Sequence, residues 1–378
     1  MVFTAKENEG TMDILNINDA KVLIGTNKVV FVTGVTGQDG SHMVDHLLKT
    51  TDYLIFGGVR RLSIKNHENI GHLENNPRFH LVNFDLSDAH SISKIVESLK
   101  PDYFINLAAQ TFVGSSWDFP TQTWECNTTG VIHILEAIRQ HKSSCRFYNA
   151  GSSEEFGDVA YIPQDENHPA RPRSPYGASK SAARQLVKVY RESYRLYAIQ
   201  GLLFNHEGTR RGEEFVTRKI TKGVARIKKA ILEGKSFVPI ELGNVKAKRD
   251  WSDAEDFVKG IWLMLNQKAP NEYVLSSNET HTIAEFVWYA FKSAGIEGAW
   301  HGQAESSEFS ISTKDAIKYD PVVSVLVKIN PKFYRPAEVD LLLGDSTKAR
   351  KELGWKPETS FEQLVDKMVK NDLKQIGL

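Results

Sequence analysis

The sequence predicts an α/β protein built on a doubly wound parallel sheet, with a smaller, interleaved α/β lobe toward the C-terminus. Three observations predict this class. Short continuous apolar runs, typical of strands buried on both faces, recur between Lys28 and Phe204. Amphipathic helical patterns separate most of these runs, and such alternation implies a parallel sheet covered on both faces. A glycine-rich turn joins the first run to the first helical pattern.

Composition is that of an ordinary globular protein. The chain has 378 residues, of which 41% are hydrophobic and 25% charged, which suits one two-lobed unit or two domains. Lys plus Arg equals Asp plus Glu, at 47 each, so net charge favours neither a nucleic acid nor a membrane as partner. There is no apolar stretch of spanning length, no signal-peptide core, and no metal-ligand spacing around the two cysteines. We therefore expect a cytoplasmic protein without a bound metal.

Strands and helices follow in a regular order from Lys28. The first strand is Val29–Val32, and five more are expected at 53–59, 79–83, 103–107, 147–150 and 198–204. Helical periodicity occurs at 92–99 and 131–139, and further helices are expected at 256–265 and from Ser360 onward. Residues 1–27 are polar without a clear period, and they resemble an added arm or a flexible start.

The turn after the first strand has the glycine spacing of a dinucleotide-binding loop. Its three glycines let the backbone turn tightly, approach a pyrophosphate and pack the next helix on the strand, while the N-terminus of that helix attracts phosphate. Because the turn lies between a buried strand and a helix, it predicts a Rossmann-type cofactor site. The loop residues expected at the cofactor are Gly34, Thr36, Gly37, Gln38, Asp39 and Gly40.

The end of the second strand indicates which dinucleotide binds. An NAD site usually has an acid roughly 20 residues after the glycine loop, to hold the ribose hydroxyls. Here Arg60 and Arg61 occupy that position, and two guanidinium groups suit the 2′-phosphate of NADP. A solvated surface pair is the alternative. Asp85, after the third strand, would meet the adenine amino group, and the run 106–110 after the fourth provides small residues beside the pyrophosphate and ribose.

A Tyr-x-x-x-Lys pair opens a long helix. Ser174 is a good N-cap and Pro175 suits the first helical position, so Tyr176 and Lys180 should lie one turn apart on one face. A lysine cation beside a phenol favours the phenolate and lowers its pKa by roughly 1 to 3 units, which makes Tyr176 a candidate general base. An ordinary half-buried tyrosine with a solvated lysine is the alternative.

Two more polar residues follow the fifth strand. Ser152 and Glu154 come at the carboxyl edge of the sheet, where open α/β folds bind ligands. The serine hydroxyl could bond a substrate hydroxyl, and the carboxylate could act as a second acid or base. With the tyrosine and lysine they suit oxidation of an alcohol followed by proton removal at the neighbouring carbon. The adjacent Glu155 leaves open that Glu154 is a surface carboxylate.

Taken together, these motifs resemble the extended short-chain dehydrogenase/reductases and, more narrowly, the GDP-mannose 4,6-dehydratase family. The general likeness is in the glycine loop, the arginine pair, the run 106–110 and the Ser152–Glu154 and Tyr176–Lys180 segments. The likeness spans about Lys28 to the C-terminus. The strings that carry the narrower likeness are 33–40, 172–180, 203–207, 210–212, 215–220, 247–251 and 334–340.

The resemblance implies an activity, a cofactor and an assembly. Tyr176 would take the proton of the sugar 4-hydroxyl as hydride leaves C4 for NADP, and Glu154 would then remove the C5 proton. Water would depart from C6, and the hydride would return to C6, which converts GDP-mannose to GDP-4-keto-6-deoxymannose. A homodimer or homotetramer is also implied, with the Tyr176 helix at one interface and the arginine pair near another.

The resemblance also assigns the remaining site residues and the domain boundaries. The catalytic set is Ser152, Glu154, Tyr176 and Lys180. Besides the glycine loop and the arginine pair, the cofactor contacts are Asp85, Leu86, Leu107, Ala108, Ala109, Tyr176, Lys180, His206 and Arg211. The substrate contacts are Ser152, Glu154, Tyr176, Asn205, Lys219, Arg249, Arg335 and Glu338. The NADP-binding domain would comprise 28–204 and 252–277, and the nucleotide-sugar lobe 205–251 and 278–378.

Arg249 suits the diphosphate because a guanidinium can bind two oxygens at once. A local ion pair between Arg249 and Asp250 is an equal alternative. The chain also departs from the family pattern: Ser152 replaces a threonine, Phe112 a histidine, Glu155 an apolar residue and Gly208-Thr209 a Ser-Pro pair. These changes leave the catalytic set intact.

Two other functions stay open. One is a nucleotide-sugar epimerase or 4-keto reductase on the same scaffold, and the other is a non-catalytic NADP-binding sensor. An epimerase or reductase has no need of a group that expels water, so Glu154 beside Ser152 favours the dehydratase. A sensor would be expected to lack one member of the tyrosine–lysine pair, and both are present.

Overall fold

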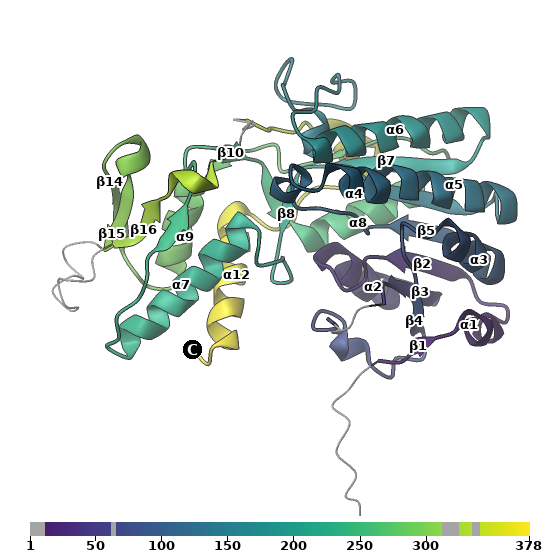
Figure 1. The fold of residues 1–378 in the computed structure, drawn as a ribbon, viewed down its shortest axis with the longest axis horizontal. Coiled ribbons are helices and arrows are strands. Elements are labelled where there is room, and N and C mark those ends of the chain that lie inside the picture. Colours follow the sequence, from purple (N-terminus) through teal and green to yellow (C-terminus); the bar gives the residue numbers. More distant parts are fainter. Residues whose placement is uncertain (1–11, 62–65, 312–324, 335–340) are drawn as a thin grey trace, which may run out of the picture.

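The computed structural model describes residues 12–61, 66–311, 325–334 and 341–378, which form a larger and a smaller lobe (Figure 1). The larger lobe contains an eight-stranded parallel sheet in the order β1-β4-β3-β2-β5-β6-β7-β12. This sheet confirms the predicted fold class, and the six expected strands are present to within a few residues. The strands are β1 (Ile14–Leu15), β2 (Val29–Thr33), β3 (Leu54–Val59), β4 (Phe79–Asn83), β5 (Tyr103–Asn106), β6 (Arg146–Ala150), β7 (Tyr197–Leu203) and β12 (Val274–Leu275).

Helices cover both faces of this sheet. In β2, Val30 and Val32 face one apolar core while Val29 and Phe31 face the other, so the strand reads as a continuous apolar run. The helices on the first face are α2 (Gln38–Thr50), α8 (Ala254–Leu265) and α11 (Thr347–Leu353). Those on the second are α1 (Ile17–Leu23), α3 (Ala89–Leu99), α5 (Gly130–His141) and α6 (Pro175–Ser193), with the short α4 (Pro120–Trp124) beside α6.

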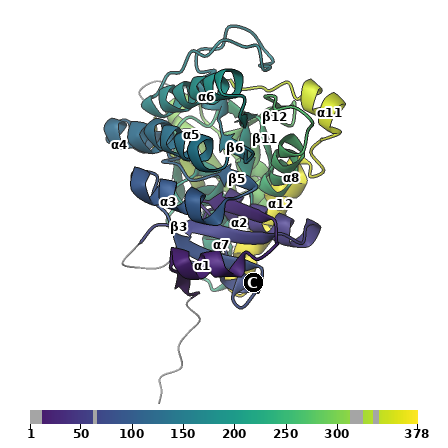
Figure 2. The same ribbon diagram turned by 90° about the vertical axis from the view of Figure 1, so that its right-hand side faces the viewer.

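The start of the described chain extends the sheet. The sequence indicated an added arm or a flexible start for residues 1–27, whereas residues 12–27, which the structure describes, contain β1 and α1. β1 pairs in parallel with β4 at the sheet edge (Figure 1). Helix α1 packs on α3, and Figure 2 shows these two helices on the same side of the sheet. Ala20 of α1 is fully buried. The side chain of Asn16 caps α1 by accepting two backbone N–H groups. Both elements are too short for their periodicity to stand out in the sequence.

The smaller lobe has its own sheet and core. Its four strands lie in the order β14-β15-β16-β9, and β9 pairs in parallel with β16 while the other pairs are antiparallel. In the described part of this lobe, three helices pack with the sheet around one apolar cluster. These elements are β9 (Ile240–Leu242), β14 (Gly298–His301), β15 (Glu308–Ile311), β16 (Val325–Ile329), α7 (Val216–Leu232), α9 (Ile283–Ser293) and α12 (Phe361–Gln375).

The chain crosses between the lobes several times. Two small sheets lie at the crossing: β8 (Asn205–Glu207) pairs with β11 (Trp251–Asp253), and β10 (Lys248–Arg249) pairs with β13 (His281–Thr282). After β11, α8 and β12 return to the larger lobe, where β12 pairs with β7. These crossings fix one lobe against the other. Among the described helices, none combines the length and the apolar character needed to cross a membrane.

Candidate active site

Two cavities open at the carboxyl ends of the strands of the large sheet. The first, of about 700 Å³, extends over the glycine loop and the ends of β3 and β4. The second, of about 550 Å³, lies between the lobes. Leu107, Ala109 and Thr111 line both, so the cavities adjoin at the loop after β5. This is the point where the strand order reverses between β2 and β5, the usual ligand site of an open α/β sheet.

The glycine loop forms the floor of the first cavity. Gly34 has a φ of +68°, and a Cβ there would lie 2.9 Å from the backbone nitrogen of Ala108. A Cβ on Gly40 would lie 2.2 Å from the carbonyl oxygen of Gly34. The close turn therefore requires glycine, as the spacing predicted. The expected cofactor residues that line this cavity are Gly34, Thr36, Gly37, Arg60, Arg61, Asp85, Leu86, Leu107, Ala108 and Ala109.

Gln38 and Gly40 shape the loop instead of lining either cavity. The side-chain amide of Gln38 donates to Asp39 at 3.0 Å and to the carbonyl of His206 at 3.1 Å, which ties the loop to β8. Ile14 of the N-terminal segment also lines the first cavity. Sequence reasoning missed Ile14 because it gave that segment no place in the sheet.

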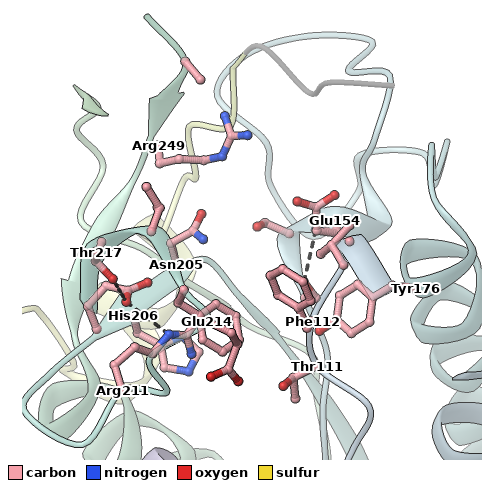
Figure 3. Close-up of a pocket in the computed structure, with 18 of the residues that line it drawn as sticks. Thr111, Phe112, Glu154, Tyr176, Asn205, His206, Arg211, Glu214, Thr217 and Arg249 are labelled. Carbon is pink, nitrogen blue, oxygen red and sulfur yellow. Dashed lines mark hydrogen bonds and ion pairs between the residues drawn. The ribbon is translucent and has the colours of Figure 1, made fainter. Parts of the chain in front are cut away.

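The four expected catalytic residues lie together on the larger-lobe wall of the second cavity, where Figure 3 shows two of them, Glu154 and Tyr176. Ser152 caps a short 3₁₀ turn, η4 (Ser153–Glu155), and its Oγ accepts the N–H of Glu154 at 3.2 Å. The α6 helix begins as predicted, because Ser174 Oγ accepts the N–H of Gly177 at 3.0 Å and Pro175 is the first helical residue.

The expected effect of Lys180 on Tyr176 is not what the structure displays. Lys180 Nζ lies 5.9 Å from the centre of the Tyr176 ring and donates to the carbonyl of Ala150 at 2.8 Å. Burial raises the pKa of the Tyr176 phenol, and a hydrogen bond with Ser152 opposes this rise. Burial also lowers the pKa of Lys180 to about 8, although Glu155 and Asp39 act to raise it. Lys180 therefore binds the end of β6, and Ser152 is the residue that hydrogen-bonds to the Tyr176 phenol.

A partly buried charged pair joins the two walls. His206 Nε2 lies 2.8 Å from Asp39 Oδ2, and His206 Nδ1 lies 2.7 Å from the carbonyl oxygen of Phe204. Two acceptors require a proton on each ring nitrogen. Although burial opposes both charges, the pair holds the pKa of Asp39 well below its usual range and raises that of His206. The pair links the glycine-loop helix to β8.

The expected substrate residues Asn205, Lys219 and Arg249 also line the second cavity. Asn205 Oδ1 is buried with no hydrogen-bond partner among the described residues, and such an orphaned atom suits a ligand contact. Lys219 Nζ lies 3.8 Å from the centre of the Phe333 ring. Arg335 and Glu338, the other two expected contacts, lie outside the described residues.

Asp250 has a role that the sequence did not reveal. Its carboxylate accepts the backbone N–H groups of Ser277, Asn278 and Gly344 at 2.7, 3.2 and 3.2 Å. The carboxylate therefore ties the segment at Ser277 and Asn278 to the segment at Gly344. Arg249, its neighbour, lines the cavity and donates to the carbonyl of Lys248 at 2.9 Å.

An aromatic contact bridges the two walls of the second cavity. The rings of Phe112 and Phe215 meet edge to face at 5.9 Å, and the guanidinium carbon of Arg211 lies 3.5 Å from the centre of the Phe215 ring. Figure 3 shows Phe112 and Arg211 on opposite sides. Arg211 also pairs with Glu207 at 3.1 Å. Phe112 was noted in the sequence as a departure from a family pattern, but no local signal there gives its partner.

The doubly wound parallel sheet with its glycine loop defines a protein of the Rossmann-type α/β class. Solved structures of similar fold include a dTDP-glucose 4,6-dehydratase from Streptomyces venezuelae with NAD bound (TM-score 0.75, 21% identity, covering 92% of this chain and 98% of that one). A UDP-glucose 4-epimerase from Thermotoga maritima is also similar (TM-score 0.73, 21% identity, 92% and 99% covered).

Sequence comparison identifies the family within this class. The model of the GDP-mannose 4,6 dehydratase family matches residues 31–368. The GDP-mannose 4,6 dehydratase of Drosophila melanogaster is 43% identical over 356 residues, which cover 92% of this chain and 87% of that protein. The human GDP-mannose 4,6 dehydratase is 40% identical, with 92% and 91% covered. The chain therefore belongs to the GDP-mannose 4,6-dehydratase family, as its motifs predicted.

Proposed function

We propose that this chain is an NADP-dependent hydro-lyase that converts GDP-mannose to GDP-4-keto-6-deoxymannose. The observation that carries the proposal is the arrangement of Glu154 with Ser152, Tyr176 and Lys180 along one cavity, in a chain of this family. A hydroxyl, a phenol and a cation serve the oxidation of an alcohol. A separate carboxyl serves the proton removal that elimination requires.

The residues of the first cavity fit NADP. The glycine loop makes a turn that has no space for a Cβ at Gly34 or Gly40, and the N-terminus of α2 favours phosphate. Arg60 and Arg61 would hold the 2′-phosphate, since a guanidinium matches phosphate with two parallel N–H groups. Asp85 would face the adenine. When bound, NADP would supply the redox chemistry by accepting a hydride from sugar C4 and returning it to C6.

Each catalytic residue has a defined proton to hold or move. The Tyr176 phenol would take the proton of the sugar 4-hydroxyl, with Ser152 in hydrogen-bond contact with the phenol. The ketone formed at C4 acidifies the C5 hydrogen. Glu154 would remove that hydrogen as a proton and then protonate the hydroxyl that leaves C6, so that water departs and the carboxylate is restored.

The smaller-lobe wall would hold the nucleotide. The cations of Lys219, Arg211 and Arg249 line the second cavity, and a nucleoside diphosphate carries the complementary negative charge. Arg249 is the best candidate for the diphosphate, because a guanidinium can bind two oxygens at once. The orphaned oxygen of Asn205 offers an acceptor for a sugar or base donor.

Epimerisation is the second candidate, because a UDP-glucose 4-epimerase shares the fold. Incubation with GDP-mannose and a catalytic amount of NADP, followed by mass spectrometry, separates the two. The proposal predicts loss of one water with no net consumption of NADP. A product of unchanged mass with altered chromatography would instead indicate the epimerase.

We also propose a homodimer or homotetramer. Large apolar side chains are exposed near α4 and α6, with Trp124 46% and Val189 51% accessible. Exposed apolar residues on neighbouring helices support an interface between copies of the chain. Light scattering of the purified protein tests this proposal, and a mass of one chain at all concentrations would contradict it.

A further inference from the structure

A chain of buried side-chain hydrogen bonds crosses the large sheet beneath the candidate active site. It starts at Thr33 on β2, whose Oγ1 accepts the N–H groups of Leu107 and Ala108 in the cofactor cavity. The chain then runs through one residue on each of the next three strands. The successive donor–acceptor distances are 2.7 Å (Thr33 to Asn106), 2.8 Å (Asn106 to Asn149), 2.7 Å (Asn149 to Gln200) and 2.8 Å (Gln200 to Glu155).

The direction of this chain requires an acceptor at its end. Each side-chain amide accepts a hydrogen bond with its oxygen and donates one with its nitrogen to the next residue. Gln200, the last amide of the chain, therefore presents N–H groups that need an acceptor. One of them reaches the carbonyl of Lys180 at 3.0 Å, and the other reaches Glu155 Oε1. Glu155 is 0% exposed. An apolar side chain at this position would leave a buried donor unpaired.

Glu155 also holds the turn that carries the reacting groups. Its Oε1 accepts the backbone N–H of Ser152 at 2.9 Å, while Ser152 Oγ accepts the N–H of Glu154. These two bonds form a capping box around η4. The carboxylate therefore fixes the backbone from which the Ser152 hydroxyl and the Glu154 carboxyl project into the cavity.

The surroundings are shaped to this carboxylate. A Cβ on Gly151 would lie 2.7 Å from Glu155 Oε1 and 2.4 Å from the carbonyl oxygen of Gly201, so the residue before Ser152 must be glycine. Glu155 Oε2 is buried and has no hydrogen-bond partner among the described residues. A buried carboxylate with one orphaned oxygen is costly to ionise, and burial raises the pKa of Glu155 to about 7.

Several charged groups face this carboxyl. Lys180 and Arg184 on α6 favour its ionised form, and Glu155 in turn raises the pKa of Lys180. The charge of Glu155 disfavours the phenolate forms of Tyr176 on α6 and Tyr148 on β6, and so acts to raise the pKa of both. Asp39 on α2 adds to the effect on Lys180 and on Tyr148. Arg184 also forms an ion pair with Glu272 at 2.9 Å. Lys180 is therefore the cation that depends most on Glu155.

We propose that Glu155 is a positioning residue: as the acceptor that ends the buried hydrogen-bond chain, it holds the Ser152–Glu154 turn and supplies a buried counter-charge to Lys180. The proposal rests on the proposed function, because that function makes Ser152, Glu154 and Lys180 the working groups. It assigns a purpose to a fully buried carboxyl next to the expected catalytic Glu154. Glu155 itself is not among the residues that line the cavity.

Two substitutions distinguish the role of Glu155 as a hydrogen-bond acceptor from its role as a negative charge. Glu155→Gln keeps an acceptor for Ser152 and Gln200 but removes the charge, whereas Glu155→Leu removes both. Loss of the counter-charge lowers the pKa of Lys180, so the alkaline limb of the kcat profile should move to lower pH by about one unit in both variants. At the optimal pH we expect kcat within about threefold of wild type for Glu155→Gln and a loss of about tenfold for Glu155→Leu. KM for GDP-mannose should change little.

Glu192→Gln is the matched control, because it removes the same charge from an exposed position near the end of α6 and should leave the profile unchanged. Profiles of both Glu155 variants that superimpose on the wild-type profile would overturn the proposal. Equal kcat losses in the two variants without a shift of the alkaline limb would also overturn the proposal, because they would indicate a purely structural role for Glu155.

A stability measurement tests the same residue without turnover. The folded-state pKa of Glu155, about 7, lies above that of an ordinary glutamate. The stability linked to this proton is therefore fully present below about pH 4.3 and is lost as pH rises through about 7. The Tm of Glu155→Gln relative to wild type should then rise between about pH 5 and pH 8. A Tm difference that does not change with pH would contradict the ionisation of a buried Glu155. Absence of dehydration by the wild-type protein would contradict only the proposed function.

Discussion

The two walls of the central cavity are built by different means. On the larger-lobe wall the groups project from the ends of neighbouring parallel strands and from the first turn of α6, and buried hydrogen bonds tie these strands together. On the smaller-lobe wall most of them project from two- and three-residue strands and loops, with Lys219 on α7, and charged pairs such as Asp39–His206 and Glu207–Arg211 hold this wall. A rigid wall suits chemistry, and a wall of separate loops suits recognition. Substitutions on the first should lower kcat, and those on the second should raise KM.

The largest expected effect is that of Glu154→Gln on the larger-lobe wall. It removes the group that takes the C5 proton, so dehydration should fall by about a thousandfold, within the range expected for a general base. Oxidation at C4 does not need this carboxyl, so a stoichiometric burst of NADPH absorbance should remain. Mass spectrometry of the product and rapid-mixing absorbance check both parts. Near-normal turnover would remove Glu154 from the mechanism.

The cofactor cavity is tested by replacing Arg60 and Arg61 together with alanine. Loss of charge-assisted hydrogen bonds to the 2′-phosphate should weaken NADP binding by about 10- to 100-fold. NAD lacks that phosphate, so its affinity should stay unchanged and serves as the internal control. Titration of intrinsic fluorescence measures both. An equal loss for the two dinucleotides would show that the arginine pair acts on the fold.

On the loop-built wall, Arg249→Met should raise KM for GDP-mannose about tenfold and leave kcat near the wild-type value. The reason is that the guanidinium would bind a diphosphate that does not react. Steady-state kinetics check the split, with the exposed Lys246→Met as a matched control of nearly equal sequence position. A fall in kcat with unchanged KM would place Arg249 with the reacting groups instead.

The smallest expected effect concerns the pair that joins the two walls. Asp39 has a lowered pKa and His206 a raised one. The carboxylate contribution to stability is lost as pH falls through its folded pKa, and the imidazolium contribution is lost as pH rises through its own. Asp39→Asn should therefore cost about 1–3 kcal/mol near pH 5 and less toward pH 8. Urea unfolding at several pH values measures this, and a cost that grows with pH would contradict a charged pair.

Much of the rigid wall could be predicted from the sequence, because its signals are local. The turn from Gly34 to Gly40, and the cap at Ser174 with Pro175, each specify backbone geometry within a few residues, and the structure has both. β1 and α1 escaped prediction because a two-residue strand gains its stability from the edge of β4 and not from its own pattern. Its length is below what periodicity can reveal.

Contacts between distant segments were also out of reach. Lys180 lies beside the Tyr176 ring as expected, but its ammonium also donates to the carbonyl of Ala150, a contact that depends on the packing of α6 on the sheet. The Phe112–Phe215 contact joins two loops from different lobes, and neither loop carries a sign of the other. Glu155 read as a departure from a pattern, and its partner Gln200 lies on another strand. Tertiary contacts decide these positions.

The most direct test of the account is the fate of the hydrogen at sugar C4. GDP-mannose carrying deuterium at C4 would be incubated with the protein and a catalytic amount of NADP, and the product analysed by mass spectrometry and NMR. We predict a product that has lost one water and carries the deuterium at C6, with no net NADPH formed. Loss of the deuterium to solvent, or one equivalent of reduced cofactor for each product, would contradict the internal hydride transfer.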